Sequence, residues 1–509
     1  MRQEIFSWLK TKAYLYLCQL LWAGAILLLP ITSLPVIKKI SGAATVAPPT
    51  AAILLLLLVI WLFPYLIKKG KMPVEGIPLL LLLGVAVVSW ALACFATIPS
   101  LRSKSVLTEG SGAFLTLLLG MGVYFITSVW PASNHNRLSI AIRLINISGI
   151  LLLTWSLVQG FYIFFLGSHY PRLLVVFQHA VSSRRDVLTL GRVSGFAYEP
   201  SWLAHMLNIV YLPVWLSATL HGYTAHKAKL WRFSLENLLL MGGVIVLFIS
   251  FSRVGVVSFS VVIIVILMNL TIRLARWLSE RWLGWISTLR KTVITPRIAG
   301  VLRVIFSIIL LAVLFSIYLA SAVGMVYAGA RFDKRLAKLI ENNPFEAGGF
   351  YETMNALAIA ERIVYWQTGL EIFADHPLFG VGLGNVGFYF PEKMPGYAWY
   401  LPEVTNILYY RPFLSNTKSL WIRILSETGL VGFGIFLAWL SLLWKSSRLA
   451  HSSNEPVVKV LGLAGQFVLI SFILEGFSID SFALPYLWFA MGLVSAAAFF
   501  TRQSLSRPG

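Results

Sequence analysis

The sequence predicts an all-α polytopic membrane protein with about twelve transmembrane helices. Apolar stretches of about 17 to 25 residues recur along the chain, which is the length that crosses a ~30 Å hydrocarbon core as a helix. Hydrophobic residues make up 58% of the chain and charged residues only 12%, well below the roughly 25% charged residues of soluble domains. Only helices and closed barrels satisfy every backbone amide in lipid, and the length of these stretches favours helices.

The expected spans follow one another along most of the chain. Their approximate boundaries are 13–37, 50–67, 77–98, 111–130, 138–166, 199–220, 235–250, 252–270, 302–327, 419–443, 458–476 and 480–500. The first span has flanking basic and small residues like those of a signal peptide. Its apolar run from about Tyr14 to Ile37 is, however, longer than an h-region of about 7–15 residues, so we interpret it as an uncleaved first span.

Lysines and arginines divide cleanly between alternate loops. The richer side carries Arg2, Lys10, Lys12, Lys68, Lys69, Lys71, Arg137, Arg143, Lys227, Lys229, Arg232, Arg273, Arg276, Arg281, Arg290, Lys291, Arg297, Arg303, Lys445, Arg448, Lys459, Arg502 and Arg507. The positive-inside rule therefore predicts cytoplasmic termini and an even number of spans. This placement also explains the net charge of +21 without a nucleic-acid partner.

This orientation predicts three parts: spans 1–9 in residues 1–327, an external loop in 328–418, and spans 10–12 in 419–509. The loop contains two expected amphipathic helices, Arg331–Asn342 and Tyr351–Ala374, and becomes rich in glycine and aromatic residues after Pro377. A second external stretch runs from about Gly167 to Tyr198. On the cytoplasmic side, Thr271–Gly300 combines tryptophans with arginines, which indicates an interfacial helix on anionic lipid.

Three apparent motifs are better explained by ordinary structure. Gly382–Gly387 matches G-x-G-x-x-G, but the fingerprint requires a strand before it and a helix after it, and this copy lies in the expected external loop. His221 and His226 have the spacing of solvated loop residues rather than of metal ligands. The aromatic residues are mostly expected at lipid-facing surfaces and interfaces.

The arginines of the external side are the candidate functional residues. Arg253 lies between two apolar runs, and a charge at membrane depth costs about 2.5–3.5 kcal/mol, so such residues usually face a cavity and a partner; the alternative is snorkelling at a helix end. Arg192 precedes the next span, where Pro200 fits the first helical turn and Glu199 either functions there or is a helix-start acid. Arg362 and His376, taken alone, fit a solvated surface.

Together these residues indicate an anionic ligand. Acidic residues are sparse on the same side, and guanidinium groups bind phosphate in a bidentate manner and stay charged when desolvated. A diphosphate carried on a lipid would use both the arginines and the apolar grooves between helices.

Four segments resemble the O-antigen ligase and O-antigen polymerase superfamily. They are GRVSGFAYEPSWLAH (Gly191–His205), FSRVGVVSF (Phe251–Phe259), ERIVYWQTGLEIFADHPLFGVGLGNVGFY (Glu361–Tyr389) and SNTKSLWIRILSETGLVGFGIF (Ser415–Phe436). The resemblance implies a GT-C-like helical fold with a large external loop. It also implies joining of glycans carried on undecaprenyl diphosphate, at the outer side of the bacterial plasma (inner) membrane, without metal, nucleotide sugar or other cofactor. The matching positions are Arg192, Arg253, Arg362, His376, Asn416 and Glu427.

One departure from the family pattern favours the polymerase branch. Ligases of this superfamily usually show His-Asn where this chain has Ser415-Asn416, so the histidine that would serve as general base for a lipid A hydroxyl is missing. Glu199 is the first candidate for the base and His376 the second. The resemblance and the residue chemistry assign Arg192 and Arg253 to the diphosphate, with Arg362 assisting from the loop and Asn416 orienting a sugar or phosphate.

Two residues keep open alternatives at this stage. Glu427 follows Arg423 by four residues, which favours an ion pair at the loop-to-helix junction over a direct contact with substrate. Trp399 either stacks on a sugar ring or packs within the loop.

The predicted function is polymerisation of lipid-linked repeat units into surface polysaccharide, with a chain-length regulator protein as a candidate partner. Two alternatives remain: a ligase that moves finished polymer to lipid A or protein, and a transporter or flippase of a lipid-linked or anionic solute. Transporters tend to show two related halves with broken spans, and no such repeat is visible here.

Overall fold

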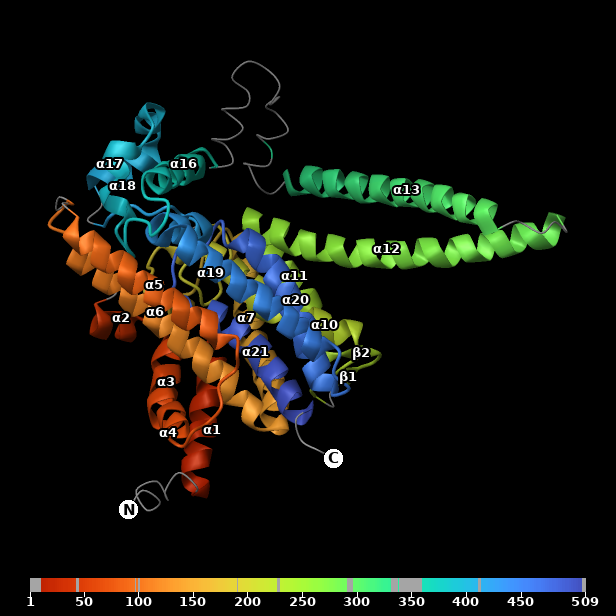
Figure 1. Ribbon diagram of the computed structural model, residues 1–509, viewed down its shortest axis with the longest axis horizontal. Coiled ribbons are helices and arrows are strands. Elements are labelled where there is room, and N and C mark those ends of the chain that lie inside the picture. Colours follow the sequence, from red (N-terminus) through yellow and green to blue (C-terminus); the bar gives the residue numbers. More distant parts are fainter. Residues whose placement is uncertain are drawn as a thin grey trace. The chain divides into compact units, whose positions relative to one another are not determined.

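The computed structural model describes residues 11–42, 45–96, 98, 101–189, 191–226, 229–290, 296–330, 337, 359–410 and 413–505. Its contacts divide the chain into two compact units, Met1–Ser258 with Val364–Gly509, and Phe259–Ile363. Figure 1 shows the elements of both units, which are described here one at a time.

The first unit is built almost entirely from helices. Its elements up to α11 are α1 (Lys12–Leu27), α2 (Pro35–Ser41), α3 (Pro49–Leu57), η2 (Leu58–Leu62), α4 (Phe63–Ile67), α5 (Gly76–Phe95), α6 (Val106–Val129), η3 (Pro131–Ser133), α7 (His135–Phe165), α8 (Arg172–Val181), η4 (Val187–Thr189), α9 (Pro200–Met206), η5 (Leu207–Tyr211), α10 (Leu212–Leu220), β1 (Lys229–Leu230), β2 (Phe233–Ser234) and α11 (Leu235–Ile249). The two short strands pair antiparallel, with Lys229 opposite Ser234 and Leu230 opposite Phe233.

The remaining helices complete both units. They are α12 (Arg253–Arg290), α13 (Pro296–Ala330), α16 (Ala360–Asp375), η6 (Val386–Phe388), α17 (Phe390–Lys393), η7 (Gly396–Tyr400), α18 (Pro402–Tyr410), α19 (Leu420–His451), α20 (Pro456–Glu475) and α21 (Pro485–Leu505). Only the first residues of α12 belong to the first unit, and α13 lies wholly in the second.

The expectation of an all-α polytopic membrane protein is confirmed. In the described part of the chain, nine helices are long and apolar enough to cross a membrane. Each of the nine coincides with an expected span, and α1, α11 and α21 occupy the places of the other three. In Figure 1 the start of α1 and the end of α21 lie at the lower end of the first unit, whereas α16, α17 and α18 lie at its upper end.

Several expected boundaries were wrong. The first span was expected to continue to residue 37, but α1 ends at Leu27 and the chain turns before α2, although Leu29 in this turn is fully buried. The last span, expected at 480–500, is shifted to Pro485–Leu505. The helix expected at Tyr351–Ala374 is described from Ala360 onward, and the one expected at Arg331–Asn342 lies, apart from Ala337, outside the described residues.

The core of the first unit lies around α21, which is buried along nearly its whole length. Small residues allow α21 to lie close to α6. A β-carbon on Gly120 would be 2.1 Å from Nε1 of Trp488, and one on Gly492 would be 1.8 Å from Oγ1 of Thr127. The Tyr124 and Ser495 hydroxyls form a hydrogen bond of 2.7 Å between the same helices. This close packing of small residues is typical of helix pairs in membranes.

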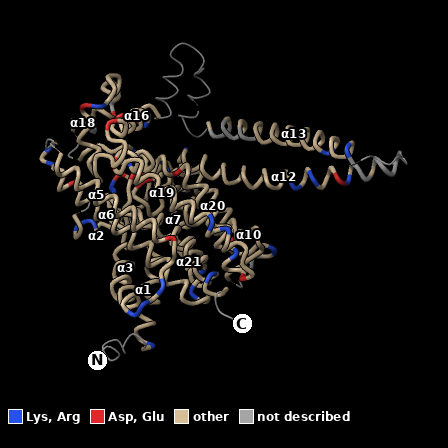
Figure 2. The backbone as a smooth tube through the Cα atoms, in the orientation of Figure 1, with Lys and Arg blue, Asp and Glu red and all other residues tan. Residues whose placement is uncertain are grey.

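Among its described residues, the second unit consists mainly of α12 and α13, two long helices with apolar surfaces. The Trp282 and Phe306 rings stack with their centroids 5.2 Å apart, and the Thr271 and Tyr318 hydroxyls lie 3.1 Å apart. Figure 2 shows the charged residues gathered near the end where α12 leads into α13. The tryptophans and most of the arginines of Thr271–Gly300 lie on α12, which continues without interruption to Arg290, and the interfacial position of this segment stays a prediction.

Candidate functional site

The short turn between α11 and α12 brings Arg192 and Arg253 to the same place in the first unit. Arg192 donates from Nε to the Ser250 carbonyl (3.1 Å) and from Nη2 to the Phe251 carbonyl (2.8 Å). A cation suits this position because the carbonyl end of α11 carries partial negative charge. Arg253 is the first residue of α12, two positions after the carbonyl that Arg192 binds. Both side chains are half-buried.

Glu199 starts a second helix that meets α12 in its first turns. It is the N-cap of α9, with extended backbone before Pro200. A β-carbon on Gly255 would lie 2.6 Å from that of Ala204, and Asn208 Nδ2 donates to the Gly255 carbonyl at 2.7 Å. The helices that begin at Glu199 and Arg253 therefore contact each other in the first turn of α12. Helix N-termini attract anions through their unpaired N–H groups and dipoles.

The Glu199 carboxylate is held by Arg184, which was not among the predicted site residues. Arg184 donates to it at 3.3 Å, and the Ser201 hydroxyl donates to its other oxygen at 3.3 Å. Arg184 also pairs with Asp186 at 3.0 Å, and this hydrogen bond lowers the pKa of the Asp186 carboxyl. These hydrogen bonds orient the Glu199 carboxylate. Because the Glu199 side chain is 41% exposed, the carboxylate is still open to a ligand.

A buried polar cluster lies directly behind these helix starts. Glu475, the last residue of α20, is fully buried and contacts His205 through one carboxylate oxygen. Asn208 donates to the other oxygen, and the same Asn208 amide binds the first turn of α12. Ionisable groups within membrane spans are costly and usually functional, which makes this cluster a candidate part of the site.

The cluster was missed because its two halves are 270 residues apart in the sequence. The available signal was the polar pair His205 and Asn208, three residues apart on one face of an otherwise apolar span. Glu475 likewise interrupts an apolar span, although its sequence position also fits a turn at the end of that span.

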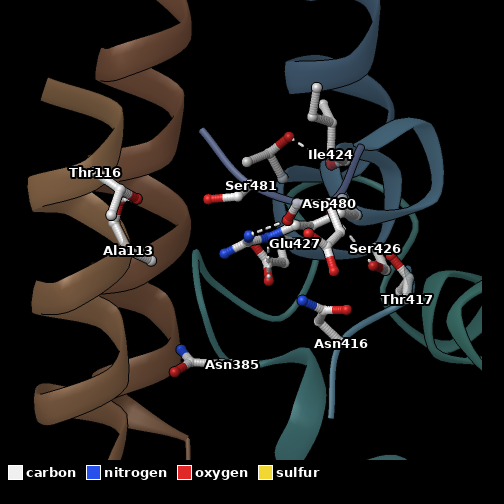
Figure 3. A network of polar contacts seen from close by, with 12 residues as sticks. Ala113, Thr116, Asn385, Asn416, Thr417, Ile424, Ser426, Glu427, Asp480 and Ser481 are labelled. Carbon is white, nitrogen blue, oxygen red and sulfur yellow. Dashed lines mark hydrogen bonds and ion pairs between the residues drawn. The ribbon is translucent and has the colours of Figure 1, made fainter. Parts of the chain in front are cut away.

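A second polar pair is formed by Arg423 and the buried Glu427. This pair and the cluster of His205, Asn208 and Glu475 are together called the polar layer. Arg423 Nε lies 3.2 and 3.1 Å from the two carboxylate oxygens of Glu427, and Arg423 Nη1 donates to the Asp480 carbonyl at 2.6 Å. The expected i, i+4 pair is therefore confirmed. Glu427 is only 1% exposed. Figure 3 shows Asp480 and Ser481 beside Glu427, with Asn416 and Asn385 on its other side.

Glycines of the segment Gly380–Gly387 pack it against α19. Val381 and Gly382 donate from their backbone N–H groups to the Ser426 and Glu427 carbonyls, each at 3.0 Å. Gly380 has φ +68°, and a β-carbon there would lie within 2.6 Å of three backbone atoms of α19. The G-x-G-x-x-G spacing thus serves backbone packing.

Four other expected site residues come from α16 and from the segments that follow it, up to α19. His376 is exposed just after α16, with its ring 5.6 Å from that of Tyr389. Asn416 is half-buried, and its side-chain oxygen accepts from the Lys418 N–H at 3.0 Å. Trp399, in η7, packs against Tyr409 at a ring distance of 5.9 Å and remains partly exposed. Arg362 belongs to the second unit.

Comparisons with known proteins agree with the resemblance seen in the sequence. Residues 238–437 match the family model described as O-Antigen ligase. This range includes Arg253, Arg362, His376, Trp399, Asn416 and Glu427, and it ends within α19. No curated protein matches the chain. Residues 238–437 are therefore an O-antigen ligase family region, which confirms the resemblance of this chain to the O-antigen ligase and polymerase superfamily.

Proposed function

We propose that this protein polymerises oligosaccharide repeat units carried on undecaprenyl diphosphate, by metal-independent glycosyl transfer at the outer face of a bacterial plasma membrane. The observation that carries the proposal is the meeting of Arg192 and Arg253 at the turn between α11 and α12. Both termini would be cytoplasmic, and a chain-length regulator protein is a candidate partner.

The donor diphosphate would bind at this turn. Arg253 and the N-terminus of α12 offer positive charge from the same point, and α9 packs against the first turn of α12. Arg192, fixed by two carbonyl groups, would complete the arrangement. In the transition state, negative charge grows on the departing diphosphate, and fixed cations stabilise that charge without rearranging.

The acceptor would be a sugar hydroxyl on a second lipid-linked unit. Its oxygen would attack the anomeric carbon of the donor glycan, and the bond from that carbon to the diphosphate would break. The electron pair would leave with the diphosphate, while the hydroxyl proton would pass to the Glu199 carboxylate. Arg184 and Ser201 orient that carboxylate, which supports Glu199 as the general base. His376, exposed at the end of α16, is the second candidate.

The other site residues would bind or position substrate. Asn416 has its amide beside the polar layer, where it can orient a sugar or phosphate. Trp399 has a partly exposed side chain that could stack on a sugar ring. Glu427 would act through Arg423 as a positioning residue. The His205–Glu475 cluster would also have a positioning role, because it holds Asn208, which binds the first turn of α12. Arg362 would assist from the loop.

Ser415 supports polymerisation over ligation. Ligases of the superfamily usually carry histidine at this position, and here the serine is only 5% exposed. A β-carbon on Gly387 would already lie 2.5 Å from the Ser415 carbonyl. The position is therefore packed and lacks a base. Ligation of finished polymer remains the second candidate, favoured by the description of the matching family.

The test is the surface polysaccharide of a strain in which the gene is deleted and then restored as a variant. Arg192→Ala and Arg253→Ala should leave single repeat units on the lipid A core, as the deletion does. Unlinked long polymer would instead indicate a ligase, and lipid-linked units trapped inside the cell would indicate a flippase. Full-length polymer from both variants would overturn the site assignment.

Matched controls separate chemistry from folding. Arg192→Ala also removes two hydrogen bonds at the end of α11, each worth about 0.5–1.5 kcal/mol, so protein abundance and thermal stability must be measured alongside. Arg192→Lys keeps the charge but not the fork of donors, and should restore only part of the polymer. Arg172→Ala removes an exposed arginine at the start of α8 and should leave polymer length unchanged.

A further inference from the structure

A basic hollow opens beside Glu199, outside the site described above. Its volume is about 460 Å³, and it is lined by Pro35, Lys38, Lys39, Gly42, Ser183 and Arg185. One wall is α2, and the other is the segment that follows α8. Of the lining residues, three are cationic and none is acidic.

Both walls are fixed to each other and to the segment that carries Glu199. The Ser183 N–H donates to the Ser33 carbonyl at 2.9 Å, and the two serine hydroxyls lie 2.7 Å apart. From the residues just before α2, the Thr32 hydroxyl accepts from the Tyr198 N–H at 2.9 Å. From the segment that follows α8, Arg184 binds the Glu199 carboxylate. The hollow is thus preformed and adjoins the candidate base.

The charges of the hollow have no internal counterion. Within the described part of the chain, Lys38, Lys39 and Arg185 form no ion pair, whereas the neighbouring Arg184 pairs with both Asp186 and Glu199. The partial negative charge at the carbonyl end of α2 can stabilise Lys38 and Lys39. It cannot stabilise Arg185 in this way, because Arg185 comes from a different segment. Three like charges around one hollow repel each other unless an anion lies between them.

We infer that this hollow binds the diphosphate of the acceptor lipid. The inference rests on the proposed function, because a polymerase must hold two lipid diphosphates at once. Arg192 and Arg253 would bind the diphosphate of the donor lipid. Lys38, Lys39 and Arg185 would bind the diphosphate of the acceptor lipid. A diphosphate bound there would bring the first sugar of the acceptor unit to the Glu199 side of the site.

The test counts lipids bound to the full-length protein in detergent by native mass spectrometry, with sugar-free undecaprenyl diphosphate as the probe. The wild type should bind two lipids. The variant Lys38→Gln/Lys39→Gln/Arg185→Gln should bind one, with the second weakened roughly fivefold for each cation removed, or about 100-fold in all. Lys68→Gln/Lys69→Gln/Lys71→Gln removes the same charge after α4 and should still bind two.

The outcomes separate the hollow from the proposed function. The hollow is not a diphosphate site if its variant still binds two lipids. The same conclusion follows if the wild type binds only one lipid and only Arg192→Gln/Arg253→Gln removes it. If the wild type binds one lipid that only the hollow variant removes, the proposed donor site is wrong and the hollow stands. Phosphatidylglycerol serves as competitor: displacement at equal concentration would show an ordinary anionic-lipid site and overturn the acceptor assignment.

Discussion

The pair of Arg423 and Glu427 allows a quantitative test of the polar layer. Replacing Arg423 by methionine would leave a carboxylate that is 99% buried without its cation. Breaking a buried pair in this way costs about 3–5 kcal/mol. The bond from Arg423 to the Asp480 carbonyl is lost as well, at about 1 kcal/mol, although the 12% exposure of Arg423 favours the lower end of the first range. We therefore expect a total cost of about 4 kcal/mol.

Glu427→Gln should cost less. The glutamine keeps the volume of the side chain and can still accept a hydrogen bond from Arg423, which also keeps its bond to the Asp480 carbonyl. A cost of about 1–2 kcal/mol is expected for the weaker hydrogen bond. In the double variant no charge is left buried, so its cost should be about 3 kcal/mol rather than the sum of about 5–6 kcal/mol.

The assay is thermal unfolding of the full-length protein in detergent, with tryptophan fluorescence as the signal. At about 2 °C per kcal/mol, Arg423→Met should lower Tm by roughly 8 °C, and the double variant by roughly 6 °C. A double variant at least as unstable as the sum of the two single variants would refute the reasoning, because the two side chains would then contribute independently.

Three further predictions concern the site and its supports. Glu199→Gln should abolish polymer at normal protein abundance, whereas Asp186→Asn, which alters the other partner of Arg184, should leave at least half of the polymer; equal loss in both would assign Glu199 a purely structural role. Gly380→Ala should lower stability by about 2 kcal/mol or more, because φ +68° is strained for alanine and its β-carbon meets backbone atoms, and unchanged Tm would contradict the packing described for this segment. Arg184→Gln should be less stable than the wild type at pH 7, and the difference should shrink below about pH 4, because the lowered pKa of Asp186 adds stability only while that carboxylate is ionised; a pH-independent difference would show that the ion pair does not contribute.

The spans could be predicted because a membrane helix needs a long apolar run, and the chain contains few such runs that serve another purpose. The boundary of α1 could not. An apolar run predicts burial, and residues of the turn after α1 are buried without being helical: Leu29 is fully buried there, and Ser33 pairs with Ala47 in a short bridge. Composition does not separate a buried turn from a buried helix.

The arginines of the site were predictable because a charged residue beside an apolar run is visible in the sequence alone. Their partners were not. Sequence spacing predicted the Arg423–Glu427 pair, whose members lie on neighbouring helical turns. Arg192 binds carbonyl groups of residues 250 and 251, and Glu475 meets His205 across the bundle. Such contacts depend on which helices become neighbours, which a single sequence does not show.

Two of the four segments that carry the family resemblance, Glu361–Tyr389 and Ser415–Phe436, contribute the two sides of one junction. The segment Pro377–Gly387 and the helix break at Gly429 exchange backbone hydrogen bonds, including that from the Leu430 N–H to the Pro377 carbonyl at 2.8 Å. Gly429 has φ +66°, and a β-carbon there would lie 2.2 Å from the Leu378 carbonyl oxygen. Because Glu427 lies inside this junction, any side chain that separates the two segments would also displace the carboxylate that holds Arg423. The glycines therefore influence the position of this carboxylate through the geometry of the backbone.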